Sequence, residues 1–391
     1  DREQHRLTEA VAHLHVVAGA HRRRHVLAEA NLRTRARDDQ PAALGEVAQR
    51  GDVEDRAVDI EQNSDISKIE GVQHAGRPIM FAFKSISTLP ERGIAAGAPA
   101  NYQTHLHSWD MNIATYVRKD PANAIPNTKL AALNKAVLAA CDGIDGVKDS
   151  LIQDPHKCKF DPVTLLCKGA DSSDCLTQAQ VDSARKIYSP ATLKDGKVVY
   201  PGMPRGGETG WAFATANGAP QQVSQGSFIV SKNEAQWDWK TFDLDKDVAI
   251  VDEKIGYINA INPDLSAFKK RGGKLLQYHG WNDQAISAEN SINYHDSVLA
   301  KMGAKQEDWY RLFMVPGMQH CRGGPGPNQF NFMAALERWR EAGQAPDSMT
   351  AYHVTGANVD MSRPLCPYPQ VAVYKGTGST NDAASFSCKA P

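Results

Sequence analysis

Two apolar stretches, each followed by a glycine-containing turn, constrain the fold of this chain more than any other feature. They cover residues 273–279 and 310–315, and the segments near 286–302 and 328–342 have the pattern of helices. Strand, helix, strand and helix in succession are typical of a parallel sheet with helices packed on its faces. The last third of the sequence therefore predicts an α/β fold.

The middle of the chain extends this pattern and then departs from it. A short strand of small residues is expected at 93–97, followed by helices near 104–118 and 128–140. Asn127 and Thr128 are suitable capping residues for the second helix. Residues 141–265 are rich in Gly, Pro, Cys and Trp, and we expect them to be irregular.

The first 92 residues differ in composition from the rest. They hold twelve arginines but two lysines, six of the thirteen histidines, and no cysteine, tryptophan or tyrosine. Large apolar residues are scarce there, so the segment predicts no core of its own. Three interpretations stay open, namely a helical or disordered extension, a basic binding arm and the product of a shifted reading frame. We treat residues 1–92 as unassigned or aberrant.

Charge and hydropathy exclude some classes of partner. The formal net charge is −1 and the sequence pI is about 7.0, so the overall balance predicts no nucleic acid and no anionic membrane as a partner. No apolar run reaches the roughly 20 residues of a membrane span. The first residues also lack the pattern of a secretory signal peptide.

The seven cysteines predict disulfides. Six of them form pairs that close loops of about 10 to 25 residues, a length at which a bridge restricts the unfolded chain. The three expected pairs are Cys141 with Cys158, Cys167 with Cys175, and Cys366 with Cys388. Such pairs favour a secreted or periplasmic protein over the alternative of seven reduced thiols. Cys321 is left over, which indicates a free thiol, an intermolecular bridge or a missing partner.

A carboxylate and an imidazole follow the two predicted strands. Asp283 lies in the turn at 280–284, and His320 lies in the turn at 316–321. Functional groups of open α/β sheets gather at the carboxyl ends of strands. A carboxylate that orients an imidazole makes it a general base for a hydroxyl nucleophile, and an acid followed by a histidine matches the α/β-hydrolase order. We predict that Asp283 orients His320 as the base.

The nucleophile that this pair requires is not recognisable. No G-x-S-x-G run occurs anywhere in the sequence. Ser85 and Ser87 lie close to where such a run belongs, but neither has the flanking glycines that permit its strained turn. We therefore assign neither serine a catalytic role.

A run of aspartates predicts a calcium site. In Cys141-Asp-Gly-Ile-Asp-Gly-Val-Lys-Asp-Ser-Leu-Ile152, the carboxylates alternate with main-chain carbonyls that a tight loop turns inward. Calcium prefers such mixed oxygen shells, and the spacing differs from that of an EF-hand. The simpler alternative is a turn whose aspartates bond to their own backbone. The expected ligands are Asp142, Asp145, Asp149 and the carbonyls of Val147 and Leu151.

Residues 93 to about 388 resemble the tannase and feruloyl esterase family, which also includes hydrolases of terephthalate monoesters. The resemblance lies in the calcium-type run and in Ala96-Gly-Ala-Pro-Ala-Asn101, Tyr278-His-Gly-Trp-Asn-Asp-Gln284 and Pro316-Gly-Met-Gln-His-Cys321. It implies an α/β-hydrolase fold with an incomplete N-terminal part. The core parts would be residues 93–140 and 266–391, and a large disulfide-linked lid would occupy 141–265.

The resemblance also implies roles for single residues. Asp283 would be the acid of a Ser-His-Asp triad, His320 its base, and the aspartate run a structural calcium site. In the family, the cysteine after the catalytic histidine is bridged to one beside the nucleophilic serine, and Cys321 matches the first of these. Its partner and the serine would lie some 25 residues before Ala96, within the unassigned segment.

The resemblance implies hydrolysis of phenolic acid esters, of the feruloyl or galloyl type, through an acyl-enzyme, with a small aromatic ester as substrate. The alternative is a catalytically inactive, calcium-binding scaffold derived from that family. Aromatic residues of the expected lid, including Trp211, Phe213, Trp237 and Trp239, could hold a phenolic ring, but such residues more often build core. We assign them no binding role.

Overall fold

A parallel sheet lies at the centre of the computed structural model, which describes residues 15–16, 58–61 and 93–390. Its strand order is β1 (His15–Val16), β2 (Val58–Glu61), β3 (Gly93–Gly97), β6 (Lys274–Gly280) and β7 (Tyr310–Val315). The last four strands are parallel, and β1 runs antiparallel to β2. The predicted parallel sheet is thus confirmed. Most of segment 1–92, including Ser85 and Ser87, lies outside the described residues.

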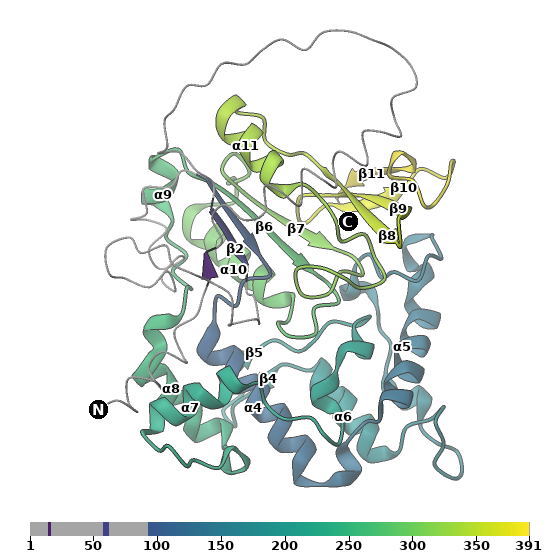
Figure 1. Ribbon diagram of the computed structural model, residues 1–391, viewed down its shortest axis with the longest axis vertical. Helices are drawn as coiled ribbons and strands as arrows, with labels where there is room; N and C mark the ends of the chain where they lie inside the picture. Colours follow the sequence, from purple (N-terminus) through teal and green to yellow (C-terminus); the bar gives the residue numbers. More distant parts are fainter. Residues whose placement is uncertain (1–14, 17–57, 62–92, 391) are drawn as a thin grey trace.

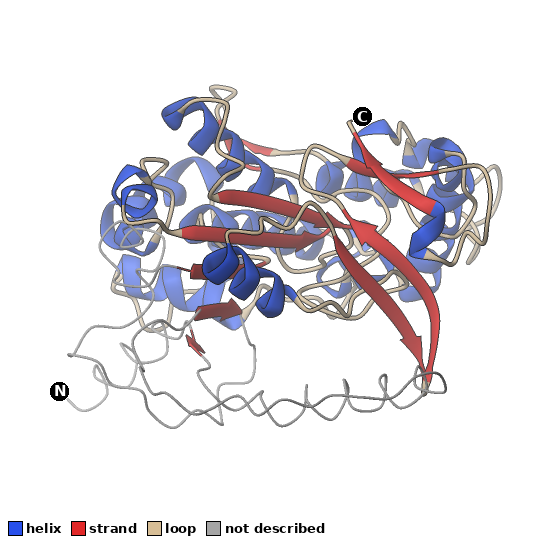
Figure 2. Ribbon diagram, turned by 90° about the horizontal axis from the view of Figure 1, so that it is seen from above, coloured by secondary structure: helices blue, strands red, loops and turns tan. Residues whose placement is uncertain are grey.

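Helices cover both faces of the sheet (Figures 1 and 2). Alternate residues of β3 divide between the faces: Ile94 and Ala96 belong to a core with α10 (Glu289–Met302) and α9 (Ser266–Lys270), whereas Ala95 belongs to a core with α11 (Phe332–Ala342). This alternation follows from the period of two along a strand. Three layers result, with the sheet between two sets of helices.

The chain between β3 and β6 builds a helical part at one end of the sheet (Figure 1). It consists mainly of α4 (Gln103–Lys119), α5 (Asn127–Cys141), α6 (Gln178–Tyr188), α7 (Gln222–Lys232) and α8 (Leu244–Ile255). The helices expected near 104–118 and 128–140 are confirmed. The expectation that 141–265 is irregular is wrong, because α6, α7 and α8 lie there.

Helix α6 is a regular, capped helix that the composition of residues 141–265 did not indicate. Thr177 accepts the main-chain N–H of Gln180 while the Gln180 side chain accepts that of Thr177, which is a complete capping box. Val181, Ala184 and Ile187 follow at helical spacing and are buried. The aromatic residues of this part also pack into cores, Trp211 and Phe213 into one and Trp237 and Trp239 into another.

Antiparallel hairpins lie outside the parallel sheet, and the sequence did not predict them. They pair β4 (Ala191–Thr192) with β5 (Val198–Tyr200), β8 (Met349–Thr355) with β9 (Asn358–Leu365), and β10 (Val371–Tyr374) with β11 (Phe386–Lys389). The last two follow α11 and lie beside the carboxyl end of β7 (Figure 1). None of the described helices is long and apolar enough to cross a membrane.

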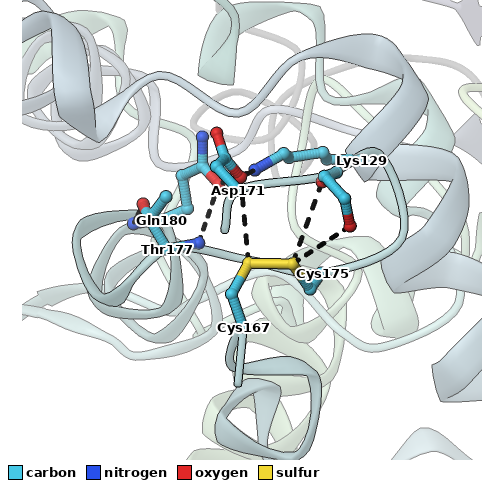
Figure 3. Close-up of a disulfide and its surroundings, with 7 residues drawn as sticks. Lys129, Cys167, Asp171, Cys175, Thr177 and Gln180 are labelled. Carbon is cyan, nitrogen blue, oxygen red and sulfur yellow. Dashed lines mark hydrogen bonds and ion pairs between the residues drawn. A yellow bond between two sulfur atoms is a disulfide. The ribbon is translucent and has the colours of Figure 1, made fainter. Parts of the chain in front are cut away.

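The three predicted disulfides are confirmed: Cys141–Cys158, Cys167–Cys175 and Cys366–Cys388. They do not include Cys321. The bridge at Cys167 and Cys175 closes the loop that carries Asp171, whose carboxylate pairs with Lys129 (Figure 3). Lys129 is buried and donates a second hydrogen bond to Gln180 at 2.8 Å. The disulfide therefore holds the counter-ion of a buried ammonium group.

Candidate active site

The Asp283 carboxylate and the His320 imidazole meet at the carboxyl ends of two adjacent strands. Asp283 follows β6, His320 follows β7, and the strands pair up to Gly280 and Val315. The Nδ1 atom of His320 lies 2.8 Å from Oδ2 of Asp283. Asp283 is buried, whereas the His320 side chain keeps about a fifth of its surface exposed. The structure thus brings the two predicted residues together.

Close contact between two loops places these side chains. A Cβ atom on Gly280 would lie 2.2 Å from the carbonyl oxygen of Met318, so a side chain has no room there. Met318 is buried, and its carbonyl accepts the N–H of Asn282 at 3.0 Å. The N–H of His320 donates to the side chain of Gln284 at 3.3 Å. These contacts join the loop of the acid to the loop of the base.

Four hydrogen bonds hold the carboxylate of Asp283. Its Oδ2 accepts from His320 and also lies 3.1 Å from Nε2 of His279, while its Oδ1 accepts the N–H groups of Ala285 and Ile286 at 2.8 and 2.9 Å. Burial acts to raise the pKa of Asp283, but the hydrogen bonds from the two histidines outweigh it and hold the pKa well below its ordinary value. Asp283 is therefore ionised at neutral pH.

His279 is a residue of the site that sequence reasoning missed. It lies inside β6, is fully buried, and bonds through Nδ1 to Ser291 of α10 at 2.7 Å. Gln277, also in β6, bonds to the same serine and to Tyr310. The available signal was two polar residues, Gln277 and His279, at alternate positions of an otherwise apolar strand. Buried polar groups need partners, and here they share one network.

Part of the chain between β3 and β6 lies against the Asp283 loop. Asn282 donates to the carbonyl of Gly206 at 2.8 Å, and Ser287 donates to that of Gly202 at 2.6 Å. Burial raises the pKa of Tyr200, and the nearby charge of Asp283 raises it further. The Tyr200 hydroxyl is buried without a hydrogen-bond partner among the described residues.

The predicted calcium ligands lie in one loop after α5. Main-chain N–H groups bond to all three carboxylates: Val147 donates to Asp145 at 3.0 Å, Asp149 to Asp142 at 3.1 Å, and Leu151 to Asp149 at 3.1 Å. Burial raises the pKa of Asp145, and the charges of Asp149 and Asp142 add to this rise. A bound cation would relieve the repulsion, and the oxygen donors are those that calcium prefers.

Two observations limit how well these three aspartates fit a calcium ion. The buried guanidinium of Arg363 pairs with Asp149 and already neutralises one carboxylate in part. Within residues 93–390, the one set of three His, Cys, Asp or Glu residues with ligand atoms within 4.8 Å of each other is Cys167, Asp171 and Cys175, and its thiols form a disulfide. The three aspartates do not converge to that degree, so the calcium site stays a prediction.

The chemistry available at the site is proton transfer by His320. Its Nδ1 bonds to an ionised carboxylate, which would stabilise the imidazolium formed when the ring takes a proton from a hydroxyl nucleophile. The sequence supplies no G-x-S-x-G run for that nucleophile. The expected partner of Cys321 would also lie in segment 1–92, outside the described residues.

Comparisons with known proteins identify the family of this chain. The sequence model of the family described as tannase and feruloyl esterase matches residues 60–389. A probable feruloyl esterase B-1 of Aspergillus oryzae is 33% identical over 331 residues, which cover 78% of this chain and 61% of that protein. An uncharacterized esterase of Xanthomonas campestris is 32% identical over 375 residues, covering 81% and 64%. The chain thus spans about three fifths of the length of these relatives.

Two solved structures share the fold. The crystal structure of feruloyl esterase B from Aspergillus oryzae has a TM-score of 0.74 and 31% sequence identity, and the match covers 79% of this chain and 66% of that one. A tannin acyl hydrolase from Aspergillus niger has a TM-score of 0.65 at 21% identity, covering 80% and 62%, and supports the fold alone.

Proposed function

Because this chain belongs to the tannase and feruloyl esterase family, we propose that its protein hydrolyses carboxylic esters of phenolic acids, with His320 as general base and Asp283 as its orienting acid. One observation carries the proposal. An ionised, buried carboxylate lies 2.8 Å from a partly exposed imidazole at the ends of two adjacent parallel strands. This arrangement is suited to activating a hydroxyl nucleophile for acyl transfer.

Residues 141–265 would form the lid of this site. The contacts of Gly202 and Gly206 with the Asp283 loop support the proposal, since they place this segment beside the dyad. A lid there would contact the ester and shield the site from bulk solvent, while still admitting the water that hydrolyses the acyl-enzyme. Its contacts would then decide between feruloyl and galloyl esters.

Asp142, Asp145 and Asp149, with the carbonyls of Val147 and Leu151, would hold a structural calcium ion. Burial is the main cause of the raised pKa of Asp145, and the charges of Asp149 and Asp142, which raise it further, support this role because a cation would offset them. Three local disulfides support a secreted or periplasmic location.

The experiment begins with the coding DNA upstream of Gly93. A Gly-Cys-Ser run in another reading frame is expected there, since it would supply both the nucleophile and the partner of Cys321. Hydrolysis of methyl ferulate is then measured for the protein with the corrected frame and for its His320→Ala variant. Release of ferulic acid that the substitution abolishes supports the proposal. Equal release by both proteins contradicts it.

The chain as written provides a second arm. We expect a serine-directed phosphonate not to label it, and stoichiometric labelling detected by mass spectrometry would show a nucleophile other than the proposed one. If no frame contains the run and methyl ferulate binds without being cleaved, the protein is the inactive scaffold instead.

A further inference from the structure

A chain of buried hydrogen bonds runs from β7 through α10 to the carboxylate of Asp283. Tyr310 donates its hydroxyl proton to Oε1 of Gln277 at 2.6 Å, and Nε2 of Gln277 donates to Oγ of Ser291 at 2.8 Å. Ser291 lies 2.7 Å from Nδ1 of His279, whose Nε2 lies 3.1 Å from Oδ2 of Asp283. All five side chains are buried, so the geometry excludes bulk water.

The partners favour one direction for the hydrogen bonds in this chain. Nε2 of His279 faces two acceptors, the Asp283 carboxylate and the carbonyl of Ile286 at 3.2 Å, so Nε2 carries a hydrogen. The oxygen of Ser291 accepts from Gln277, and its own proton can go to Nδ1 of His279 when that ring is neutral. In that tautomer the ring carries its proton on Nε2. Burial keeps the hydroxyl of Tyr310 protonated by raising its pKa far above the ordinary value.

Two imidazoles thus share one carboxylate oxygen, but they differ in what they can do. The His320 side chain is partly exposed, whereas His279 is fully buried and its Nδ1 lies 2.7 Å from the hydroxyl of Ser291. The backbone donors at Oδ1 of Asp283 fix the orientation of the carboxylate without His279. The bond from His279 must therefore act mainly on the charge of Oδ2.

We propose that His279 is a positioning residue that moderates the basicity of His320 through the carboxylate of Asp283. Its N–H group stabilises the negative charge on Oδ2 and so weakens the pull of that oxygen on the His320 proton. His320 then stays unprotonated, and ready to act as a base, at neutral pH. The proposal deepens the esterase function proposed above and rests on it for its biological meaning.

Other groups lie next to Asp283 and His320. Tyr200 approaches Asp283 from β5, and its raised pKa keeps it neutral. The side chain of Gln284 accepts the N–H of His320, and the N–H of Arg322 donates to the carbonyl of His320 at 2.8 Å. Tyr200 and Gln284 are uncharged, and each of these groups is unchanged in the variants below. A shift in the pKa of His320 between those variants therefore reports on His279.

The test measures the pKa of His320 by NMR titration of the full-length chain labelled with ¹⁵N-histidine. His279→Leu removes the donor to Asp283, and His279→Gln restores one through the side-chain amide. The matched control is His107→Leu, because His107 is buried and bonds to Ser227 through Nδ1 at 2.7 Å but belongs to α4 and is not one of the four hydrogen-bond partners described for Asp283. Circular dichroism confirms that each variant is folded.

We expect His279→Leu to raise the pKa of His320 by about one unit, a roughly tenfold gain in proton affinity. His279→Gln should return it close to the value of the parent chain, and His107→Leu should leave it unchanged. An unchanged or lowered pKa in His279→Leu overturns the proposal, as does a His279→Gln variant that behaves like His279→Leu.

A measurement on the parent chain needs no variant. The ¹⁵N shifts of His279 should show a neutral ring with its proton on Nε2 throughout the range in which His320 titrates. Titration of His279 in that range, or a proton on Nδ1, contradicts the proposal. These readouts do not involve hydrolysis, so they can fail while the esterase proposal holds, and they can succeed on a chain that has no nucleophile.

Discussion

Replacing Asp283 by asparagine tests whether the carboxylate organises the site. An amide has one acceptor oxygen where the carboxylate has two. Whichever way it turns, its NH₂ group meets either the imidazole donors or the N–H groups of Ala285 and Ile286. About two of the four bonds to Asp283 are then lost within a buried site. Since a hydrogen bond to a charged group contributes roughly 1.5–3 kcal/mol, we expect a loss of about 3–5 kcal/mol of unfolding free energy at pH 7.

The lowered pKa of Asp283 also predicts how the stability difference between the parent and Asp283→Asn changes with pH. The pKa of Asp283 in the folded protein is below its ordinary value of 3.8, so its contribution to stability is complete above that value. The contribution disappears as the pH falls below about 4, where protons bind to the unfolded chain first. The difference between parent and Asp283→Asn should therefore shrink between pH 5 and pH 3.

Urea unfolding, followed by tryptophan fluorescence at several pH values, measures both quantities. The control is Asp360→Asn, because Asp360 pairs with His353 on the exposed β8–β9 hairpin and its loss should matter little. An Asp283→Asn variant within 1 kcal/mol of the parent at pH 7, or a difference that stays constant down to pH 3, refutes the reasoning.

Three further predictions concern other parts of the chain. Replacing Cys167 and Cys175 by serine should cost about 2–3 kcal/mol of unfolding free energy in urea, less than removal of the Cys366–Cys388 bridge, which closes a longer loop; the reverse order would contradict the loop argument. Tyr200→Phe should maintain or raise the melting temperature, since it removes a buried hydroxyl without a described partner; a loss above about 1 kcal/mol would reveal one. A calcium chelator should lower the melting temperature of the parent but not of Asp145→Asn, and an unchanged parent melt would count against calcium.

The sheet and the dyad could be predicted because their signals are local. The stretches at 273–279 and 310–315 match β6 and β7 closely, since strands buried on both faces form continuous apolar runs. Parallel strands place their carboxyl ends at one edge, so the contact of Asp283 with His320 followed from the order of elements. The cysteine spacing likewise identified all three bridges.

The remaining features depend on partners that are distant in sequence. Nothing beside His279 indicates that Ser291 and Asp283 will satisfy its ring. Helices α6, α7 and α8 were missed because glycine, proline and tryptophan dominate the composition around them, although Val181, Ala184 and Ile187 keep a helical period. The Asp149–Arg363 ion pair joins residues 214 positions apart, and no local pattern predicts it.

The pairing of β6 with β7 sets the positions of Asp283 and His320 independently of the segment inserted between β3 and β6. The whole segment from α4 to α9 enters between β3 and β6, and none of it passes between β6 and β7. Its length and sequence can therefore diverge while the spacing of acid and base stays set by the sheet. A different segment could be inserted at the same place, between β3 and β6, without rebuilding the contact between Asp283 and His320.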